Sequence, residues 1–360
     1  MTRLLEILIS LAIVTVLFVA VGILLPSSRH LSNSVETNRK MPIVFDTLNS
    51  VRRFKDWNPA VAGDPNIKIK LSGPESGVGA QVSWDSTEEA LGKGSWKITA
   101  SEPNKRVEYA IDDVDRGTNK RSEFSFKPTG KAGRNIQITQ TYDVDYGWNL
   151  LGRFSGLYVT SNIGERMKIG LQSLSNMLAT IPNLDYTVLG QDDPTMAPRI
   201  VERPAQNMLV LNAAVPLVQD TIQAQMKTNI EWIKKNIEAN GLEAVGPVRI
   251  ITNEYGAQIY SFDVAQEVRK KGTTGNTAKL EGLNLANNVE LLYSEPTKVA
   301  VVPFKGHMSN LQNVRDALRA WLMTRGFETS ERGYEVWKNG IDAGFAAGQE
   351  GEYDVVWAVK

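Results

Sequence analysis

The sequence predicts an α+β protein attached to a membrane by one N-terminal helix. Three observations carry this prediction. An almost unbroken apolar run covers residues 7–25, short alternating segments separated by turn residues fill residues 30–144, and a weak internal repeat relates residues 231–264 to residues 320–355. Alternation with a period of two indicates strands, whereas apolar residues spaced three and four apart indicate helices. A chain of 360 residues is long enough for two or three domains.

The charge balance and the residue usage exclude several classes of function. Lys plus Arg and Asp plus Glu number 40 each, so the net charge is zero, and we expect no nucleic-acid partner because such binding needs a basic surface. The chain has no cysteine, which excludes disulfides and thiolate chemistry. His30 and His307 show no metal-ligand spacing. With the common catalytic and phosphate-loop motifs also missing, we expect neither a metal nor a cofactor.

The N-terminal apolar run is long enough to cross a bilayer as a helix. A cleaved signal peptide is the alternative, but its apolar core is usually shorter, and no small-residue cleavage site is evident over residues 21–28. We therefore expect an uncleaved anchor over residues 1–28 that contacts the lipid bilayer through residues 4–25, in the cell membrane of a bacterium. Basic residues flank the run on both sides, so the side that carries the rest of the chain stays open.

Residues 29–182 have the element order of a sheet curled around one long helix. We expect a strand over residues 30–38, a helix over residues 42–48, and further strands over residues 67–71, 80–84, 94–101, 106–111, 122–126 and 135–144. The closing helix stops before Pro182, and its apolar stripe consists of Ile163, Met167, Leu171, Leu174 and Leu178.

This first domain resembles the SRPBCC family of START-like and polyketide-cyclase-like helix-grip domains. The resemblance rests on residues 44–46, 57–59, 72–74, 77–80, 83–84, 94–98 and 102–107. It implies a deep apolar cavity between the sheet and the helix, and it transfers no catalytic residue, because these vary among members. Tryptophans that face such a cavity would offer a ligand flat apolar walls, and Trp84 and Trp96 are the candidates here.

The internal repeat lies in residues 199–360, after an aperiodic linker over residues 183–198. An amphipathic helix ends before Gly326, and a strand follows over residues 334–337; residues 231–250 echo this order. The repeat predicts two copies of one strand–helix–strand–strand unit packed together. In this alignment Arg249 is the counterpart of Glu335.

Residues 199–360 resemble a GyrI-like effector-binding domain. The matching pieces are residues 303–307, 320–322 with Gly326, 334–337 and 353–359. The resemblance implies two halves related by a pseudo-twofold axis around a central pocket, where a strand glutamate meets cationic aromatic ligands. Only Glu335 inherits that role. The closing strand reads Val356-Trp357-Ala358-Val359 where the family often has Ile-Pro-Val, so the resemblance does not predict which residues form the far wall of the pocket.

Glu335 is the principal candidate site residue because a carboxylate among aromatic residues is costly to bury without a partner. Tyr334, Trp337, Trp321 and Arg249 complete this candidate ligand site. The alternative is that Glu335 and Arg249 are edge-strand residues that face water.

Two groups of carboxylates, residues 112–115 and residues 143–145, could perform acid–base chemistry if burial separated their pKa values. Both lie at strand ends beside turn residues, so we interpret them as solvated turns.

Two functional classes fit these observations. The first is a membrane-anchored binding protein for small hydrophobic or amphipathic molecules, cationic aromatic ones included, with a cavity in each of the two domains. The second is a hydrolase or cyclase that acts on a small hydrophobic or xenobiotic substrate, with Glu335 as the acid or base. A protein-binding module is a third class, since some GyrI-like relatives inhibit a topoisomerase, but an anchor argues against it. We prefer the binding protein and leave the question of catalysis open.

Overall fold

The computed structural model describes residues 2–88, 91–275, 278–330, 332–345 and 350–360. The chain divides into two compact units, Met1–Asn183 and Leu184–Lys360. Each unit contains its own antiparallel sheet and its own buried core, which agrees with the expected α+β class.

The first unit begins with α1 (Thr2–Leu24), which exposes nearly all of its apolar side chains. Within the described ranges, this is the one helix long and apolar enough to cross a membrane, over Arg3–Leu24. Its 22 residues rise by about 33 Å, against a hydrocarbon core of about 30 Å. A signal sequence near the N-terminus meets the same criterion, so length and composition alone leave both interpretations open.

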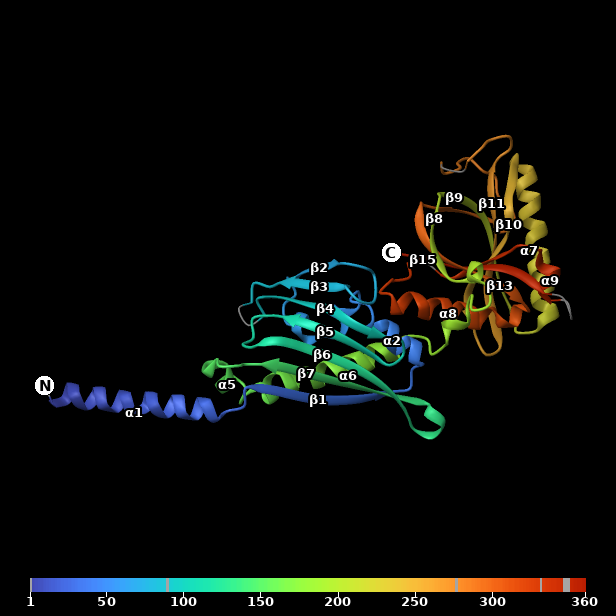
Figure 1. Ribbon diagram of the computed structural model, residues 1–360. Helices are drawn as coiled ribbons and strands as arrows, with labels where there is room; N and C mark the ends of the chain where they lie inside the picture. The colour runs from blue at the N-terminus through green and yellow to red at the C-terminus, as the bar shows by residue number, and fades with distance from the viewer. Residues whose placement is uncertain (1, 89–90, 276–277, 331, 346–349) are drawn as a thin grey trace. The chain divides into compact units, whose positions relative to one another are not determined.

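The sheet of the first unit has the strand order β1-β7-β6-β5-β4-β3-β2, with every neighbouring pair antiparallel (Figure 1). Buried and exposed residues alternate along the strands, so one face of the sheet supplies the core. The expected antiparallel meander is therefore confirmed, although β6 begins four residues earlier than predicted. The strands are β1 (Ser28–Thr37), β2 (Lys68–Ser72), β3 (Gln81–Asp85), β4 (Lys93–Glu102), β5 (Arg106–Asp112), β6 (Thr118–Thr129) and β7 (Asn135–Asp145).

The long helix α6 (Glu165–Ala179) closes the first unit and buries the predicted stripe of Met167, Leu171, Leu174 and Leu178. It packs against β1 and against two short helices that the sequence analysis interpreted only as a turn-rich crossing. The second of them begins after Asn58, whose side-chain oxygen accepts a hydrogen bond from the backbone N–H of Ala60 at 2.9 Å and so caps it. The other helices are α2 (Met41–Leu48), α3 (Phe54–Trp57), α4 (Pro59–Ala62), α5 (Leu150–Ser155) and the π-helical turn η2 (Thr160–Gly164).

The sheet of the second unit has the strand order β12-β9-β11-β10-β14-β15-β13-β8 and is antiparallel throughout. The order is symmetric about the boundary between β10 and β14. On one side of it β10, β11 and β9 follow outward, and on the other side β14, β15 and β13 follow in the corresponding places. The strands are β8 (Arg199–Arg203), β9 (Gln206–Pro216), β10 (Leu242–Tyr255), β11 (Ile259–Lys270), β12 (Glu290–Ser294), β13 (Thr297–Gly306), β14 (Tyr334–Trp337) and β15 (Gly351–Val359).

The two faces of this second sheet carry different cores. The helices α7 (Gln219–Ala239), α8 (Leu311–Thr324) and α9 (Ile341–Phe345) contribute to the larger core, which includes Trp337 and Tyr353. A smaller core, built from strand residues that include Tyr334, covers the opposite face. Because side chains alternate along a strand, β14 sends Glu335 and Trp337 to the helix-covered face and Tyr334 to the other.

The segment expected to be a linker, residues 183–198, lies almost wholly in the second unit and is packed against it. It contains the short 3-10 turns η3 (Tyr186–Val188) and η4 (Pro194–Met196). Tyr186 is buried, and the guanidinium of Arg325 lies 5.7 Å from the centre of its ring.

Candidate functional site

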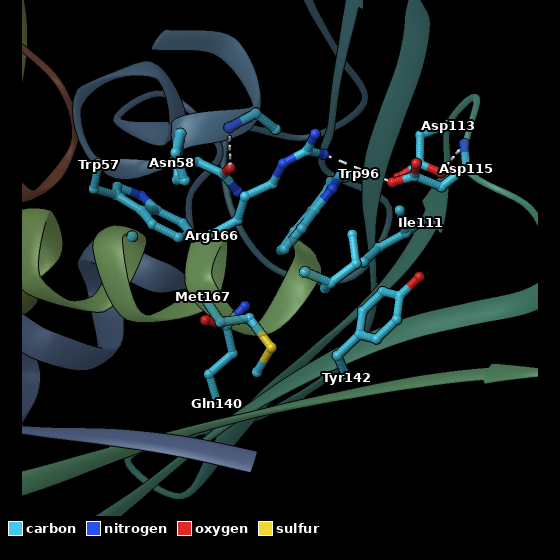
Figure 2. A pocket seen from close by; sticks show the side chains of 14 residues that line it. Trp57, Asn58, Trp96, Ile111, Asp113, Asp115, Gln140, Tyr142, Arg166 and Met167 are labelled. Atoms are coloured by element: carbon cyan, nitrogen blue, oxygen red, sulfur yellow. Dashed lines mark hydrogen bonds and ion pairs between the residues drawn. The ribbon is translucent and has the colours of Figure 1, made fainter. Parts of the chain in front are cut away.

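A cavity of about 60 Å³ lies in the first unit, between the sheet, α6 and the short helices α3 and α4 (Figure 2). Its walls are mostly apolar and aromatic, with two carboxylates, one guanidinium and two amides among them. The lining residues are Trp57, Asn58, Pro59, Ala60, Trp96, Ile111, Asp113, Asp115, Gln140, Tyr142, Ile163, Arg166, Met167 and Gly170.

The cavity is much smaller than the resemblance to helix-grip domains implies, because aromatic rings fill the space between sheet and helix. The ring of Phe54 lies 5.2 Å from that of Trp96, and the ring of Trp57 lies 5.5 Å from that of Phe124. A water molecule needs about 10–15 Å³ of such volume. The remaining space therefore suits a few waters, one aromatic ring or a short alkyl group.

Of the two tryptophans proposed for this domain, Trp96 lines the cavity and Trp84 belongs to the neighbouring core. Trp96 lies on β4 and faces the cavity beside Trp57. Trp84, on β3, stacks on Phe54 with ring centres 6.2 Å apart and covers the backbone of Gly94, where a Cβ atom would lie 2.3 Å from the indole. Trp84 therefore supports the cavity wall from behind.

Two carboxylates reach the cavity from the turn between β5 and β6, and a buried lysine holds that turn. The ammonium of Lys120 donates to the carbonyl oxygens of Asp113 at 2.9 Å and Asp115 at 2.8 Å, and it also contacts the Asp113 carboxylate. Arg166 extends from the start of α6 toward this turn, and its Nη1 lies 3.7 Å from Oδ2 of Asp115 (Figure 2). The interpretation of residues 112–115 as a solvated turn is therefore wrong for Asp113 and Asp115.

The environment of this turn changes the acidity of two side chains. Burial raises the pKa of Asp115, the charge of Asp113 raises it further, and Arg166 and Lys120 oppose both effects. Burial and the same two carboxylates raise the pKa of Tyr142, so its hydroxyl remains a hydrogen-bond donor. The spacing of carboxylates at a strand end is the same whether they face water or a cavity, so the sequence alone does not distinguish the two cases.

Two buried polar atoms of the lining lack a hydrogen-bond partner among the described residues. They are the side-chain oxygen of Gln140 and the indole nitrogen of Trp57. The amide nitrogen of Gln140 donates to Ser122 Oγ at 3.0 Å, and Ser122 donates to the carbonyl oxygen of Thr141 at 2.8 Å. These bonds fix the orientation of the amide, which leaves one acceptor and one donor for a hydroxyl-bearing ligand.

In the second unit, Glu335 is wholly buried and paired with an arginine of α8. Arg315 Nη1 lies 2.5 Å from Oε1 of Glu335, and Arg315 Nη2 donates to Gln312 at 2.7 Å. Oε2 of Glu335 is buried without a partner in the described part of the chain. Burial raises the pKa of Glu335, and Arg315 partly offsets that effect. The alternative of a water-facing edge-strand residue is thus wrong for Glu335, and Arg249 is buried as well.

Trp337 and Tyr353 are on the same side of the sheet as Glu335. Their rings meet edge to face, with centres 4.9 Å apart. Burial and the charge of Glu335 raise the pKa of Tyr353 to about 12. The Tyr353 hydroxyl and the Trp337 indole nitrogen are also buried without partners within the described ranges, so this face holds three polar atoms that could bind a polar ligand group.

Arg249 lies on the face opposite Glu335, which corrects its proposed role as the counterpart of Glu335. The register pairs Arg249 with Val336 and Ile250 with Glu335, so Ile250 shares a face with Glu335 and Arg249 does not, because neighbouring residues of a strand point to opposite faces. Arg249 instead binds Glu267 at 2.6 Å, and its guanidinium lies 5.5 Å from the ring centre of Tyr334.

Trp321 belongs to neither group. It is half-buried on α8, six residues after Arg315, and six residues on a helix turn a side chain about 120° away. The guanidinium of Arg325 lies 4.6 Å from the centre of its ring. The structure thus joins Glu335 with Trp337 and Tyr334 with Arg249, and it places Trp321 elsewhere.

Comparison with solved structures gives matches at low identity, and three of them cover less than half of this chain. The EcmrR C-terminal domain is 17% identical over 45% of this chain and 96% of its own, with a TM-score of 0.35. Truncated norcoclaurine synthase from Thalictrum flavum is 13% identical over 42% of this chain and 93% of its own, with a TM-score of 0.34. Protein Ms6760 from Mycobacterium smegmatis is 15% identical over 42% and 91%, with a TM-score of 0.31.

The first unit also matches a protein family by sequence. No curated protein matches the chain. The match covers residues 28–178, and all the described residues that line the cavity, from Trp57 to Gly170, fall inside it. Among the described residues, no group of three or more His, Asp or Glu side chains is placed so that it could hold a metal ion. Residues 28–178 match the family described as "Polyketide cyclase / dehydrase and lipid transport".

Proposed function

We propose that the protein is a membrane-anchored binder of small amphipathic molecules and that the cavity of the first unit is its principal site. The observation that carries this proposal is an apolar cavity whose buried polar atoms, Gln140 Oε1 and Trp57 Nε1, lack partners among the described residues. Leaving such groups unpaired costs about 1–3 kcal/mol each. A ligand whose hydroxyl group donates to Gln140 Oε1 would satisfy that acceptor and gain stability in return.

The size and polarity of the cavity define the ligand. Trp57, Trp96, Ile111 and Met167 would enclose one aromatic ring or a short alkyl end, while the hydroxyl meets Gln140. The turn that carries Asp113 and Asp115 would then lie beside the more polar part of the molecule. The description of the matched family, which includes lipid transport, supports a ligand of this kind. The helix α1 supports the anchor by its length and apolarity, and the side of the membrane stays open.

The test is calorimetric titration of the full chain, in detergent, with para-cresol and its longer alkyl homologues. Ile111→Phe adds a ring at the cavity wall, and we expect it to lower the affinity by about tenfold or more. Leu71→Phe, at an exposed position on β2, is the matched control and should bind as the wild type does. Equal binding by all three proteins would refute the cavity as the site.

We further propose a second site in the second unit, at Glu335. The mirrored order of its central strands supports two related halves of a GyrI-like domain, and the unpaired Oε2 of Glu335 supports contact with a ligand that donates a hydrogen bond or carries positive charge. Benzyltrimethylammonium is a suitable cationic aromatic probe. Under conditions in which circular dichroism shows both proteins folded, Glu335→Gln should bind it more weakly, and unchanged binding would refute the site.

Catalysis by Glu335 has less support than binding. An acid or base must reach the reacting proton, whereas Glu335 is wholly buried and already paired with Arg315. Asp115 has a raised pKa and lines the cavity, so it is the better placed carboxyl group for any proton transfer to a bound molecule.

A further inference from the structure

Large apolar side chains around α5 stand uncovered on the first unit. Trp148 is 81% exposed, Leu151 55%, Leu157 50% and Tyr158 65%. All four fall within eleven consecutive residues that include α5: Trp148 precedes the helix, Leu151 lies in it, and Leu157 and Tyr158 follow it. Exposed apolar groups gathered in this way mark a surface that contacts something apolar.

The position of α5 is fixed by its contacts with the last turns of α1. The rings of Phe154 and Phe18 stack with centres 4.4 Å apart. Gly22 permits this approach, since a Cβ atom there would lie 3.2 Å from the ring of Phe154. Arg153 Nη1 donates to the carbonyl oxygens of Ile23 at 2.8 Å and Leu25 at 3.2 Å.

These bonds join the end of the apolar helix to the sheet domain. The last carbonyl groups of a helix have no partner within it and carry a partial negative charge, so the buried guanidinium of Arg153 is well placed at this end. The segment from Trp148 to Tyr158 therefore stands at the level where α1 ends (Figure 1).

We propose that a lipid bilayer covers this surface and that Trp148, Leu151, Leu157 and Tyr158 lie in its interfacial layer beside α1. This inference rests on the membrane anchor of the proposed function. If α1 spans the bilayer, its C-terminal turns lie at the interface, and the uncovered side chains are held at that depth. Tryptophan and tyrosine are the residues enriched there, because their rings are apolar with one polar end.

The β5–β6 turn, which contributes carboxylates to the cavity lining, lies at the same end of the sheet. Ser28, the first residue of β1, pairs with Asp145 at the end of β7, and Thr118 at the start of β6 pairs with the same residue. The β5–β6 turn that carries Asp113 and Asp115 immediately precedes Thr118. The register thus places the carboxylate-bearing side of the cavity at the end of the sheet that faces the proposed membrane surface, which fits ligands that are amphipathic and partition into the interface.

The absence of cysteine in the chain permits a test with single labels on the full-length protein in vesicles of phosphatidylcholine and phosphatidylglycerol. Leu151→Cys and Tyr158→Cys report on the proposed surface, and Val14→Cys reports on α1. Lys131→Cys is the matched exposed control, in the β6–β7 turn at the other end of the 11-residue strand β7, which is about 35 Å long. Each protein carries one environment-sensitive fluorophore. Lipids with a doxyl group near the headgroup quench labels at the interface, and lipids with a doxyl group near the end of the acyl chain quench labels at the bilayer centre, where Val14 would lie.

We expect quenching by the headgroup-labelled lipids at Leu151→Cys and Tyr158→Cys to exceed that at Lys131→Cys by about threefold or more, because interfacial side chains lie beside the headgroups, together with quenching at Val14→Cys by the lipids labelled near the end of the acyl chain. Quenching at Val14→Cys alone would overturn this inference and leave the anchor intact. No quenching at Val14→Cys would overturn both. Labels at residues 151 and 158 that are shielded from aqueous iodide but are not quenched by the lipids would replace the bilayer with a protein partner.

Discussion

The two units of the chain bury carboxylates in different ways. In the first unit, Asp115 is partly buried at the edge of a cavity, 3.7 Å from Arg166. In the second, Glu335 is wholly buried and lies 2.5 Å from Arg315. Burial raises the pKa of both groups. The first carboxylate is close to a space that a ligand can enter, whereas the second already has a charged partner inside the core.

This difference shows that a raised carboxylate pKa indicates a ligand site only when the charged partner of the carboxylate and its accessibility to a ligand are known as well. A close buried pair stabilises a fold only when both members are present, since a lone buried charge is costly. A partly exposed charge contributes little to stability because solvent screens it. We therefore expect changes at Glu335 and Arg315 to affect folding first, and changes at Asp115 to affect chiefly the cavity.

The largest effect should follow from removal of one member of the buried pair. Arg315→Leu leaves Glu335 buried and unpaired, which should lower the free energy of unfolding by about 3–5 kcal/mol. The additional substitution Glu335→Leu should restore most of it, because replacement of both charges by apolar groups is often neutral. Denaturant unfolding followed by tryptophan fluorescence measures both.

The pH dependence of this variant sharpens the expectation. Without Arg315, the folded state holds Glu335 still more strongly in its protonated form, so the loss of stability should shrink as the pH falls and grow as it rises. Lys234→Leu is the control, because Lys234 and Glu231 form an exposed ion pair on α7, and its effect should stay below about 1 kcal/mol. Equal losses in Arg315→Leu and Lys234→Leu would mean that the buried pair contributes no more to stability than an exposed pair.

A smaller effect is expected at Asp115. Its raised pKa means that the folded state favours the protonated form. The corresponding stability is present below about pH 3.9, the ordinary aspartate pKa, and is lost as the pH rises through the folded value. Because the side chain is 39% exposed, the change should stay below about 1 kcal/mol.

Asp115→Asn should remove this part of the pH dependence while the affinity for para-cresol stays measurable. Unfolding at a series of pH values, with wild-type protein as the reference, gives the comparison. Identical pH dependence in the two proteins would mean that Asp115 is as solvated as an ordinary turn residue.

Much of the fold was predictable because its elements obey simple periods. The stripe on α6 and the alternation in β7 follow directly from one buried face. The helices α3 and α4 were missed because each has four residues, too few to show a period. The segment 184–198 has no period either, although Tyr186 is buried.

The candidate sites were less predictable, because a site depends on which face and which end of a strand a residue occupies. The sequence alignment of the repeat made Arg249 the counterpart of Glu335, whereas the register puts the two on opposite faces of the sheet. Asp113 and Asp115 were identified as a carboxylate group but interpreted as solvated, since only the turn built around Lys120 brings them to the cavity. Gln140 gave no signal, because its unpaired oxygen is a property of the packed structure.

The most direct test of the central claim is an experimental structure of the full chain with para-cresol. The account predicts the ring between Trp57, Trp96 and Met167, with the phenolic hydroxyl within about 3 Å of Gln140 Oε1. A ligand found only on the protein surface, or a cavity closed by rearranged aromatic side chains at saturating para-cresol, would contradict it.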